Sequence, residues 1–499
     1  MMADAACRAE TNATRVLYVN NETGSDFFDG LSPEPNKEVP GKGPFASLQK
    51  AFSSVVTSDQ ISVANTGKPY PGGNSLSQAG GTAERPMVID GHGAVISGLD
   101  IIPAKSWKKL QNNICETDFW PKSNYLRGYS GINHWIGSPQ IWWLDGQPAF
   151  NCKSEEELKE NPGGFFWNKK IKKLWIHLPV GKTIDKVEVK IPVHGTAINI
   201  NCNFVVVMNF RSIFSWNDGF DAHGSGKNIV FKNCIATDNC GQGFSCHDWS
   251  SVLYEDCLAE RCASSGSCDV NQCAAIYRRC VLVNNTFEAG VYATEQTSHI
   301  YESCLIVGNQ PFEQIWALHQ AKMNFFNCVI IGNRDGKPGL MRLQNGTVYF
   351  EQCTMADAPF FCRIQDASFG LLSVRNCVLT RFSEPFVTLS EKARGRMQFE
   401  NNVYFDTPGI QVGETVYGER QGNESGPDLD FDRESTWRDP QLAGRLKVEF
   451  SGDSFLHKAG KRYGQPSRVG AILPSSVWEL YEKTRGEIVS PAGVKRAAP

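Results

Sequence analysis

The chain reads Phe231-Lys-Asn-Cys234, and a phrase of the same kind returns at Tyr254-Glu-Asp-Cys257. Seven such phrases recur every 23–25 residues, each an aromatic residue or Val, then two mostly polar residues, then Cys; they end at Cys234, Cys257, Cys280, Cys304, Cys328, Cys353 and Cys377. Val207-Met-Asn-Phe210 fits the repeat before them, and Phe399-Glu-Asn-Asn402 fits the repeat after them. A fixed period in the low twenties is typical of a stacked solenoid.

A second short strand follows a glycine in several repeats. It reads Gly219-Phe-Asp-Ala-His223, Gly243-Phe-Ser-Cys-His247 and Gly290-Val-Tyr-Ala-Thr294. No helical segment separates these strands, whereas a leucine-rich repeat would show Leu spacing and a helical segment in every unit. The pattern predicts an all-β, single-stranded solenoid of the right-handed parallel β-helix type. The cysteines of the ladder are then expected to be buried, reduced thiols.

The 499 residues divide into four segments. Residues 15–103 are predicted to form an N-terminal cap and the first coils, 104–186 an insertion, 187–413 the regular coils, and 414–499 a loop and a capping segment with one helix near Ser476–Arg485. The insertion is rich in tryptophan, with Trp107, Trp120, Trp135, Trp142, Trp143, Trp167 and Trp175. We expect it to pack beside the mouth of the helix and to line one side of a cleft.

Charge and composition exclude several classes of function. The formal net charge of −3 gives no reason to expect a nucleic acid or an anionic membrane as partner. No apolar run reaches the length of a transmembrane helix, and Met1 to Asn20 lacks the apolar core of a signal peptide. The 17 cysteines contain no CxxC pair, which favours a reducing compartment.

Both ends of the chain carry a family resemblance. Tyr18-Val-Asn-Asn-Glu-Thr-Gly-Ser-Asp26 with Gly43-Pro-Phe-Ala-Ser-Leu-Gln49, the coil-like Met87–Gly98, and the closing Asp439-Pro440 and Val469-Gly-Ala471 resemble the pectate-lyase-like superfamily of right-handed β-helix proteins. The resemblance implies a carbohydrate-active protein that is secreted or periplasmic and meets a polysaccharide or oligosaccharide. It leaves the reaction open, because the superfamily contains polysaccharide lyases, glycoside hydrolases, C5-epimerases and non-enzymatic adhesins.

One outward face is predicted to hold the chemistry. Side chains alternate along a strand, so that Phe220 and Ala222 point into the helix while Asp221 and His223 point out. The same count over successive coils gives an outward column of Asp221, His223, Ser245, His247, Asp269, Tyr292, Trp316, Arg342 and Arg363, with Asp218, Asp248, Glu295 and His319 in flanking turns. An extended sugar chain is expected to lie on this face, bound by Trp316, Arg342, Arg363, Glu295 and His319.

The first predicted mechanism is β-elimination or C5-epimerisation of an acidic, uronate-containing polysaccharide. A base removes the C5 proton, and a cation or a protonated carboxyl group stabilises the enolate. His223 or His247 is the predicted base, Tyr292 the acid, and Arg342 or Arg363 the neutralising group. Asp221-Ala-His223 is similar to the Asp-Pro-His motif of alginate C5-epimerases, with Ala222 in place of proline.

Two alternatives stay open. A glycoside hydrolase would use a pair of carboxylates, for which Asp221, Asp248, Asp269 and Glu295 are the candidates; Asp145-Gly146 in the insertion resembles segments of β-helix glycosidases. A carbohydrate-binding β-helix without catalysis is the other alternative. No cofactor is expected, and the alternative is a divalent cation held by Asp221, His223, His247 and Asp269, with zinc better suited to imidazole ligands than calcium.

Overall fold

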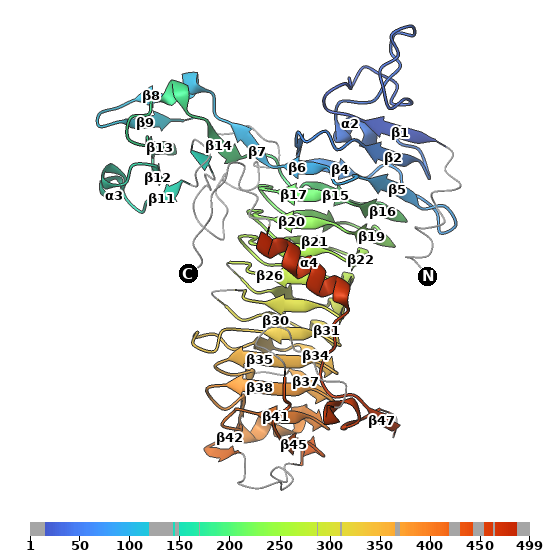
Figure 1. The fold of residues 1–499 in the computed structure, drawn as a ribbon, viewed down its shortest axis with the longest axis vertical. Helices are drawn as coiled ribbons and strands as arrows, with labels where there is room; N and C mark the ends of the chain where they lie inside the picture. Colours follow the sequence, from blue (N-terminus) through green and yellow to red (C-terminus); the bar gives the residue numbers. More distant parts are fainter. Residues whose placement is uncertain are drawn as a thin grey trace.

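The structure is a computed structural model that describes residues 15–118, 143–144, 149–168, 170–286, 288–309, 312–364, 370–418, 430–442, 454–462 and 465–486. Its main body is a column of stacked coils, with three parallel sheets running along it (Figure 1). Each coil contributes one strand to each sheet, and the next coil pairs with it in register. The predicted parallel β-helix is therefore confirmed.

Sheet A carries the aromatic residue of each repeat. Its thirteen strands are β1 (Val16–Val19), β2 (Gln60–Val63), β5 (Met87–Asp90), β16 (Val205–Met208), β19 (Ile229–Lys232), β22 (Ser251–Glu255), β25 (Ala274–Arg278), β28 (Ser298–Glu302), β31 (Lys322–Phe326), β34 (Thr347–Glu351), β37 (Leu371–Arg375), β40 (Met397–Glu400) and β44 (Asp432–Arg433).

Sheet B follows directly after the repeated Cys or its equivalent. Its strands are β3 (Tyr70–Pro71), β6 (Val95–Ser97), β17 (Arg211–Ile213), β20 (Ile235–Thr237), β23 (Leu258–Glu260), β26 (Val281–Val283), β29 (Leu305–Val307), β32 (Val329–Ile331), β35 (Thr354–Ala358), β38 (Val378–Phe382), β41 (Val403–Phe405) and β45 (Thr436–Trp437).

Sheet C holds the strands that follow the glycines. Its strands are β4 (Asn74–Leu76), β15 (Ile198–Ile200), β18 (Phe220–Ala222), β21 (Phe244–Cys246), β24 (Ser267–Asp269), β27 (Val291–Ala293), β30 (Ile315–Leu318), β33 (Met341–Gln344), β36 (Cys362–Ile364), β39 (Val387–Leu389), β42 (Ile410–Val412) and, antiparallel at the end, β43 (Thr415–Tyr417).

The core of the column is built from stacked identical positions. The rings of Tyr254, Tyr277, Tyr301 and Phe325 stack with centroids 4.8 Å apart from one coil to the next. All seven ladder cysteines are fully buried, and their thiols are free. The residue before each of them has a positive φ, as at Asn233 (51°), which turns the chain sharply between sheets A and B. The predicted ladder of buried, reduced thiols is confirmed.

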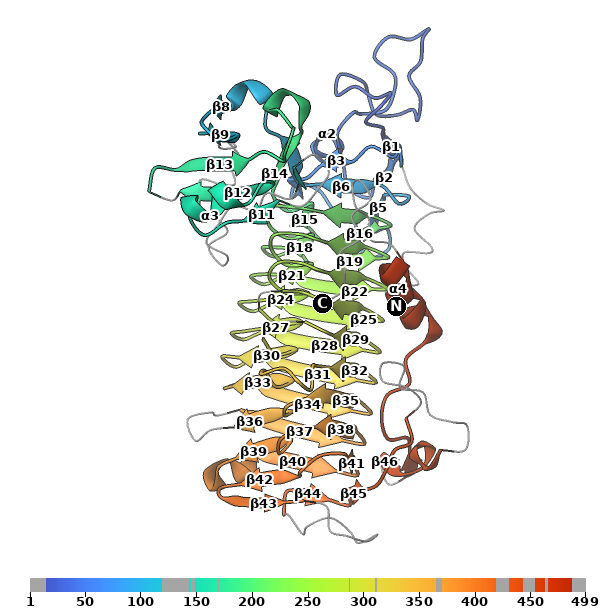
Figure 2. The ribbon, with the colours of Figure 1, turned by 60° about the vertical axis from the view of Figure 1, so that its left-hand side comes forward.

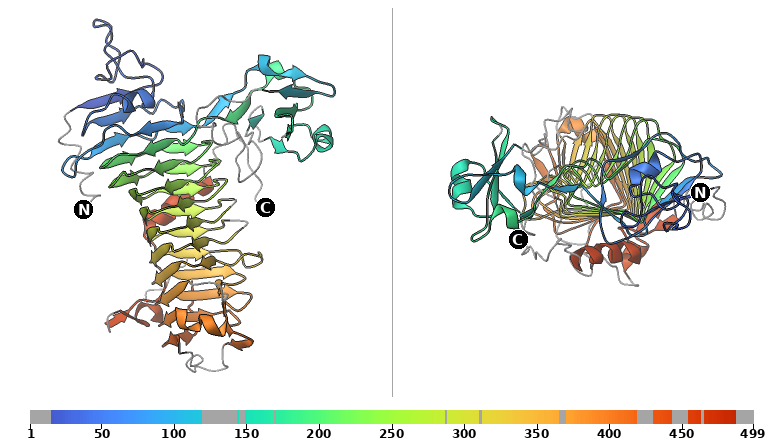
Figure 3. Two further views of the ribbon diagram at one scale, coloured as in Figure 1. Left: turned by 180° about the vertical axis from the view of Figure 1, so that it is seen from behind. Right: turned by 90° about the horizontal axis from the view of Figure 1, so that it is seen from above.

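Other elements surround the column. Helix α2 (Leu48–Phe52) lies at the N-terminal end, and helix α4 (Ser475–Gly486) packs with Val477 and Tyr481 on the outer surface of sheet B. Figure 2 and the end-on view in Figure 3 show α4 beside the stack of coils rather than inside it. The helix predicted near Ser476–Arg485 is α4. Within the described residues, no helix has both the length and the apolar character needed to cross a bilayer.

The tryptophan-rich segment projects from the first coils (Figure 1). Strands β8 (Lys108–Lys109), β9 (Ile114–Thr117), β11 (Phe150–Asn151), β12 (Gly164–Asn168) and β13 (Lys173–His177) form a five-stranded sheet beside helix α3 (Glu155–Glu160). Strand β14 (Val189–Pro192) joins β7 (Leu99–Ile101) and β10 (Trp143–Leu144). Trp107 and Trp167 belong to an apolar cluster separate from the core of the column. Trp120, Trp135, Trp142, Asp145, Gly146 and residues 419–429 of the predicted loop lie outside the described residues.

Candidate active site

The register of sheet C decides which side chains share the outward column. Asp221 pairs with Ser245, Ser245 with Cys268, Cys268 with Tyr292, Tyr292 with Trp316, and Trp316 with Arg342. Since Met341 pairs with Cys362, Arg363 follows Arg342 in the same column. The structure therefore places Asp221, Tyr292, Trp316, Arg342 and Arg363 on one face, as the sequence predicts.

Asp269 is the exception, and its predicted outward position is wrong. It pairs with Cys246 and Ala293, which are interior positions, and its side chain is fully buried. The outward position of this coil belongs to Cys268. Counting two residues from Gly266, as Asp221 is two residues from Gly219, gives Cys268 directly. Because side chains alternate with period two, a one-residue difference in register moves Asp269 from the surface to the core.

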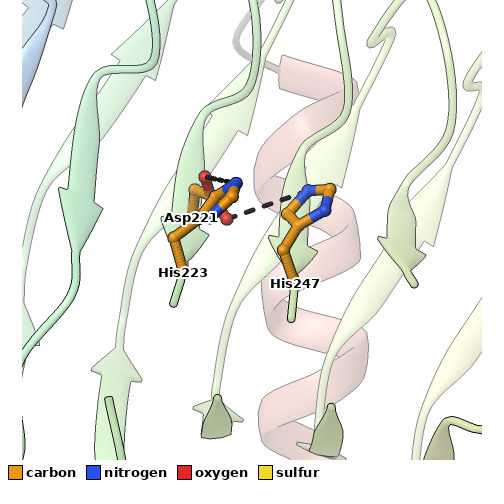
Figure 4. Close-up of side chains that lie close together, drawn as sticks. All are labelled: Asp221, His223 and His247. Atoms are coloured by element: carbon orange, nitrogen blue, oxygen red, sulfur yellow. Dashed lines mark ion pairs between the residues drawn. The ribbon is translucent and has the colours of Figure 1, made fainter. Parts of the chain in front are cut away.

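Two imidazoles face one carboxylate at the ends of β18 and β21. The rings of His223 and His247 are stacked, with centroids 4.6 Å apart and planes 18° apart. Nε2 of His223 lies 3.9 Å from Oδ2 of Asp221, and Nε2 of His247 lies 4.0 Å from Oδ1 of the same carboxylate (Figure 4). The side chains of His223 and His247 are 41% and 23% exposed, whereas that of Asp221 is only 4% exposed. The imidazoles are therefore more accessible to a ligand than the carboxylate between them.

Asp248 fixes the tautomer of His223. Oδ2 of Asp248 lies 2.9 Å from Nδ1 of His223 and also accepts the backbone N–H of Gly224 at 3.0 Å. Asp248 reaches this position because it has a positive φ of 57° in the turn after β21. An ionised carboxylate can only accept hydrogen bonds, so Nδ1 carries a proton and the lone pair of neutral His223 is on Nε2. This lone pair faces Asp221.

Asp218 supports the cluster from inside the preceding turn. Its carboxylate accepts the backbone N–H of Gln242 at 3.0 Å and the hydroxyl of Ser245 at 2.9 Å. Burial, together with the nearby carboxylate of Asp221, raises the pKa of Asp218 to about 6. Asp218 is completely enclosed and therefore acts on the site through Asp221 and Ser245 rather than by contact with a ligand.

Asp221 is more easily protonated than an exposed aspartate. Burial raises the pKa of Asp221 to about 6, while the imidazole of His223 and a hydrogen bond from Ser245 oppose this rise. The carboxylates of Asp248 and Asp269 raise the pKa of Asp221 further, whereas the imidazole of His247 lowers the pKa of Asp218.

A groove of about 450 Å³ runs beside the cluster, along the turns that follow the strands of sheet C. Four pairs of successive residues line it, one pair from each of four coils: Asp248 and Trp249, Asn271 and Gln272, Glu295 and Gln296, and His319 and Gln320. The indole of Trp249 is well exposed, and its Nε1–H donates to Oε1 of Gln272 at 3.0 Å. The groove thus combines one open aromatic face with a row of hydrogen-bonding side chains. The sequence analysis identified three of the residues that line the groove, Asp248, Glu295 and His319, and missed the other five. Those five could have been found, because each pair follows the equivalent position of a sheet C strand at the same distance along the chain.

A second group lies further along the column. The rings of Tyr292 and Trp316 are in edge-to-face contact at 5.7 Å, and the guanidinium of Arg342 lies 4.6 Å from the Trp316 ring centroid. Arg342 also lies 3.6 Å from Glu313, and Arg363 pairs with Glu384. Burial raises the pKa of Tyr292 to about 12.

This second group does not meet the imidazoles. Tyr292 is three strands from Asp221 and Arg342 is five, which at about 4.8 Å per strand corresponds to roughly 14 and 24 Å. The structure therefore does not place Tyr292 as an acid, or Arg342 and Arg363 as neutralising cations, at a sugar held by His223 and His247. They remain candidate positions for more distant sugars of the same chain.

The comparisons with known proteins concern the fold. No family model matches the sequence, and no similar curated protein was found. Among solved structures, the chain is similar to XylC in complex with xylose, with a TM-score of 0.54 and 10% identity over 86% of this chain and 87% of that one. A glycoside hydrolase (TM-score 0.44, 10% identity, 88% and 99% of the two chains) and pectate lyase Pel9A (0.49, 12%, 93% and 97%) are also similar. At these identities the likeness is one of fold, and the chain is a β-helix solenoid of stacked parallel sheets.

Proposed function

We propose that the protein is a carbohydrate-active enzyme whose proton transfers are carried out by His223 and His247. The observation that carries the proposal is the pairing of His223 with Asp248, which leaves an exposed Nε2 lone pair next to a second imidazole and a buried carboxyl group. A carboxylate that orients a histidine through Nδ1 is an arrangement suited to general acid–base catalysis. The likeness in fold to a structure that contains xylose supports a carbohydrate as the ligand.

The reaction that this arrangement supports best is β-elimination or C5-epimerisation of a uronate. Nε2 of His223 removes the C5 proton. In the elimination the C4–O bond breaks, and His247, stacked on the next coil, protonates the leaving oxygen. The two ring centroids are only 4.6 Å apart, so both imidazoles can contact the same bound sugar. One ring can then act as base while the other acts as acid.

Stabilisation of the enolate is assigned to Asp221. Because burial raises the pKa of Asp221 to about 6, a modest fraction of this group is protonated near neutral pH, and a substrate carboxylate brought close to it would raise that fraction. A protonated carboxyl group can donate to the developing charge of the substrate carboxylate. This role replaces the one predicted for Arg342 and Arg363, which are too far along the column.

Hydrolysis of a glycosidic bond is a second candidate, favoured by the same raised pKa values. A carboxylic acid that is still protonated at mildly acidic pH can protonate a leaving glycosidic oxygen, while a base on the other side activates water. Asp221 would be the acid, and the base would be a carboxylate that lines the groove, Asp248 or Glu295. Asp269 is removed from the set of candidate carboxylates because it lies inside the column.

The sugar chain is expected to extend from the cluster along the groove. Trp249 offers an aromatic face, and Asn271, Glu295 and His319 offer hydrogen-bonding groups on successive coils. Tyr292, Trp316, Arg342 and Arg363 provide a second, more distant row for stacking and for acidic groups. Both rows run along the column, which suits a polymeric or oligomeric ligand better than a single sugar.

The test is a product assay on a panel of acidic and neutral polysaccharides. Ultraviolet absorbance of an unsaturated uronate identifies elimination, new reducing ends without that absorbance identify hydrolysis, and deuterium uptake from solvent at C5 without cleavage identifies epimerisation. The purified His247→Ala variant is the matched control and is expected to lose the product signal. Turnover that is unchanged in both His223→Ala and His247→Ala would contradict the proposal.

A further inference from the structure

We propose that Asp221, His223 and His247 form a binding site for one divalent transition-metal ion of the Zn²⁺ type. Their ligand atoms, one carboxylate oxygen and two imidazole nitrogens, all lie within 4.8 Å of one another. They come from two successive coils whose strands β18 and β21 pair in register, so the rigid column fixes their relative positions. The three side chains lie close together, with contacts from Asp221 to both imidazoles (Figure 4).

The contacts inside this cluster are incomplete without a cation. Both Nε2 atoms are 3.9–4.0 Å from the Asp221 oxygens, which is too long for a hydrogen bond. Oδ1 of Asp221 is buried and has no hydrogen-bond partner among the described residues. A buried polar atom without a partner is costly. A metal ion with bonds of about 2.0–2.2 Å would draw these ligand atoms closer together and give Oδ1 of Asp221 or its neighbouring oxygen a partner.

A second layer of contacts presents the ligands in the form that a metal needs. Asp248 accepts the Nδ1 proton of His223, which leaves Nε2 of this ring as the free donor atom. Asp248 is itself held by the backbone N–H of Gly224, and its own backbone N–H donates to Oδ1 of Asn271. A carboxylate bound to the outer nitrogen of a ligating histidine orients the ring and raises its basicity as a ligand.

The donor set selects the kind of ion. Two imidazole nitrogens and one carboxylate oxygen suit Zn²⁺ and its neighbours among the transition metals, whereas Ca²⁺ and Mg²⁺ prefer sites made only of oxygen. Three protein ligands leave at least one coordination position free, and the exposure of His223 directs that position towards solvent. An ion can therefore enter and can keep a water molecule or a ligand oxygen.

A second cluster, one coil further along the column, shows why geometry alone does not suffice. Cys246, Asp269 and Cys273 also have ligand atoms within 4.8 Å of one another, but all three are buried in the core of the column. Both oxygens of Asp269 already accept the hydroxyl of Tyr277, at 3.0 Å each. The adjacent thiol of Cys246, together with burial, raises the pKa of the Cys273 thiol well above its usual range, which disfavours the thiolate that a metal requires. Asp221 is also buried, but its two imidazole neighbours are accessible and no tyrosine hydroxyl occupies its oxygens.

Binding of such an ion has a consequence that rests on the proposed function. Coordination would occupy the Nε2 lone pairs of His223 and His247, the atoms assigned to proton transfer. Zn²⁺ is therefore expected to inhibit turnover reversibly, and a chelator is expected to restore it. The binding itself does not depend on the reaction and can be measured without any substrate.

The experiment is a calorimetric titration of the full-length, tag-free protein with ZnSO₄ after treatment with a chelator. One equivalent is expected to bind to the wild-type chain, and stoichiometric binding is expected to disappear in His223→Ala and in His247→Ala. Asp248→Asn keeps all three ligands and is expected to weaken binding by about 10- to 100-fold. His92→Ala is the matched control, because His92 is another exposed histidine beside an aspartate, Asp90. The His92→Ala variant should bind zinc as the wild type does.

The outcomes separate the two proposals. Zinc binding that survives in both His223→Ala and His247→Ala, or that is absent from a wild-type chain with native circular dichroism, overturns the metal site whatever the activity is. Zinc binding lost with these histidines in a chain without activity on any glycan supports the metal site and counts against the proposed function. Calorimetry with MgCl₂ is expected to show no saturable binding, and equal affinity for Mg²⁺ and Zn²⁺ would contradict the assigned donor set.

Discussion

Two aspartate–histidine groups lie near each other along the column and differ in their accessibility and their partners. The outer group, Asp221 with His223 and His247, belongs to β18 and β21 of sheet C, whereas the inner group joins Asp269 of β24 to His299 of β28 in sheet A. Asp221 faces two accessible imidazoles at 3.9–4.0 Å, and its Oδ1 has no hydrogen-bond partner among the described residues. Asp269 lies inside the column, where His299 approaches it at 3.1 Å and Tyr277 donates to both of its oxygens. Asp269 and His299 are both completely buried.

The difference shows what the register of one strand decides. The same residue types give a group with accessible imidazoles at the outer face and a fully enclosed group inside the column. A buried carboxylate whose oxygens are hydrogen-bonded and paired contributes to the fold, and its partners cannot reach a ligand. We therefore assign chemistry to Asp221, His223 and His247, and a structural role to Asp269, His299 and Tyr277.

The largest expected effect is on turnover in the outer group. His247→Ala and His223→Ala are each expected to lower kcat by a factor of about 10² to 10⁴, the usual contribution of a general acid or base. The circular dichroism spectrum should not change, because both side chains are on the surface. His92→Ala serves as the control and should keep wild-type kcat. A loss of less than threefold in both cluster variants would remove the imidazoles from the mechanism.

Substitutions in the inner group, Asp269 with His299 and Tyr277, are expected to lower the stability of the fold instead. His299→Ala leaves the Asp269 carboxylate buried without its imidazole, and the free energy of unfolding is expected to fall by about 3–5 kcal/mol. Urea unfolding measures this loss, with His92→Ala again as the surface control, expected to change stability by no more than about 0.5 kcal/mol. A change as small as that of the control would show that the Asp269–His299 contact does not contribute to the fold.

The pH dependence of stability sharpens the contrast. In the folded chain burial raises the pKa of Asp221 to about 6, against about 3.9 for an unfolded aspartate. The folded state therefore binds this proton more tightly, so the stabilisation is complete below about pH 4 and is lost as the pH rises through about 6. The Asp221→Asn variant has a neutral amide at this position, which cannot ionise, and it therefore avoids this loss.

The variant should accordingly gain stability relative to the wild type as the pH rises. The gain expected between about pH 4 and pH 7.5 is on the order of 1–3 kcal/mol, with most of it appearing before pH 6.5. Unfolding midpoints of both proteins across this range measure it. A stability difference that does not vary with pH would mean that Asp221 titrates alike in the folded and unfolded chains.

The smallest effect is expected in the groove. Trp249→Ala removes the open aromatic face beside the imidazoles and is expected to raise KM about 2- to 10-fold, in keeping with aromatic contacts of about 0.5–1.5 kcal/mol, with kcat unchanged. Phe27→Ala, at a fully exposed aromatic residue of the N-terminal segment, is the control. A fall in kcat with constant KM would place Trp249 in the chemical step rather than in sugar binding.

The fold could be predicted from the sequence because each coil repeats one phrase. The spacing of Cys234 to Cys377 alone specifies parallel coils with equivalent residues stacked, and sheets A and B follow it closely. Asp221, His223 and His247 could also be predicted to share a face, since two consecutive Gly-Phe phrases fix their register.

The partners within the site were harder to predict. The contact of His223 with Asp248 depends on the positive φ of Asp248, and the groove depends on turn residues such as Trp249 and Gln272, whose positions no strand pattern specifies. Asp269 was misplaced because Gly266-Ser-Cys-Asp269 lacks the Phe that marks the first interior position in the preceding coils. The roles predicted for Tyr292 and Arg342 failed because of distance along the column: residues that share a face with the imidazoles can still lie several coils away from them.

The most direct test compares Asp221→Asn with Asp269→Asn in one experiment that measures kcat and the free energy of unfolding near neutral pH. We predict that Asp221→Asn loses most of its turnover while keeping or gaining stability. We predict the opposite for Asp269→Asn, with a clear loss of stability and near-wild-type kcat for the molecules that remain folded. Wild-type turnover in Asp221→Asn, together with lost turnover in fully folded Asp269→Asn, would contradict the assignment of chemistry to the outer group.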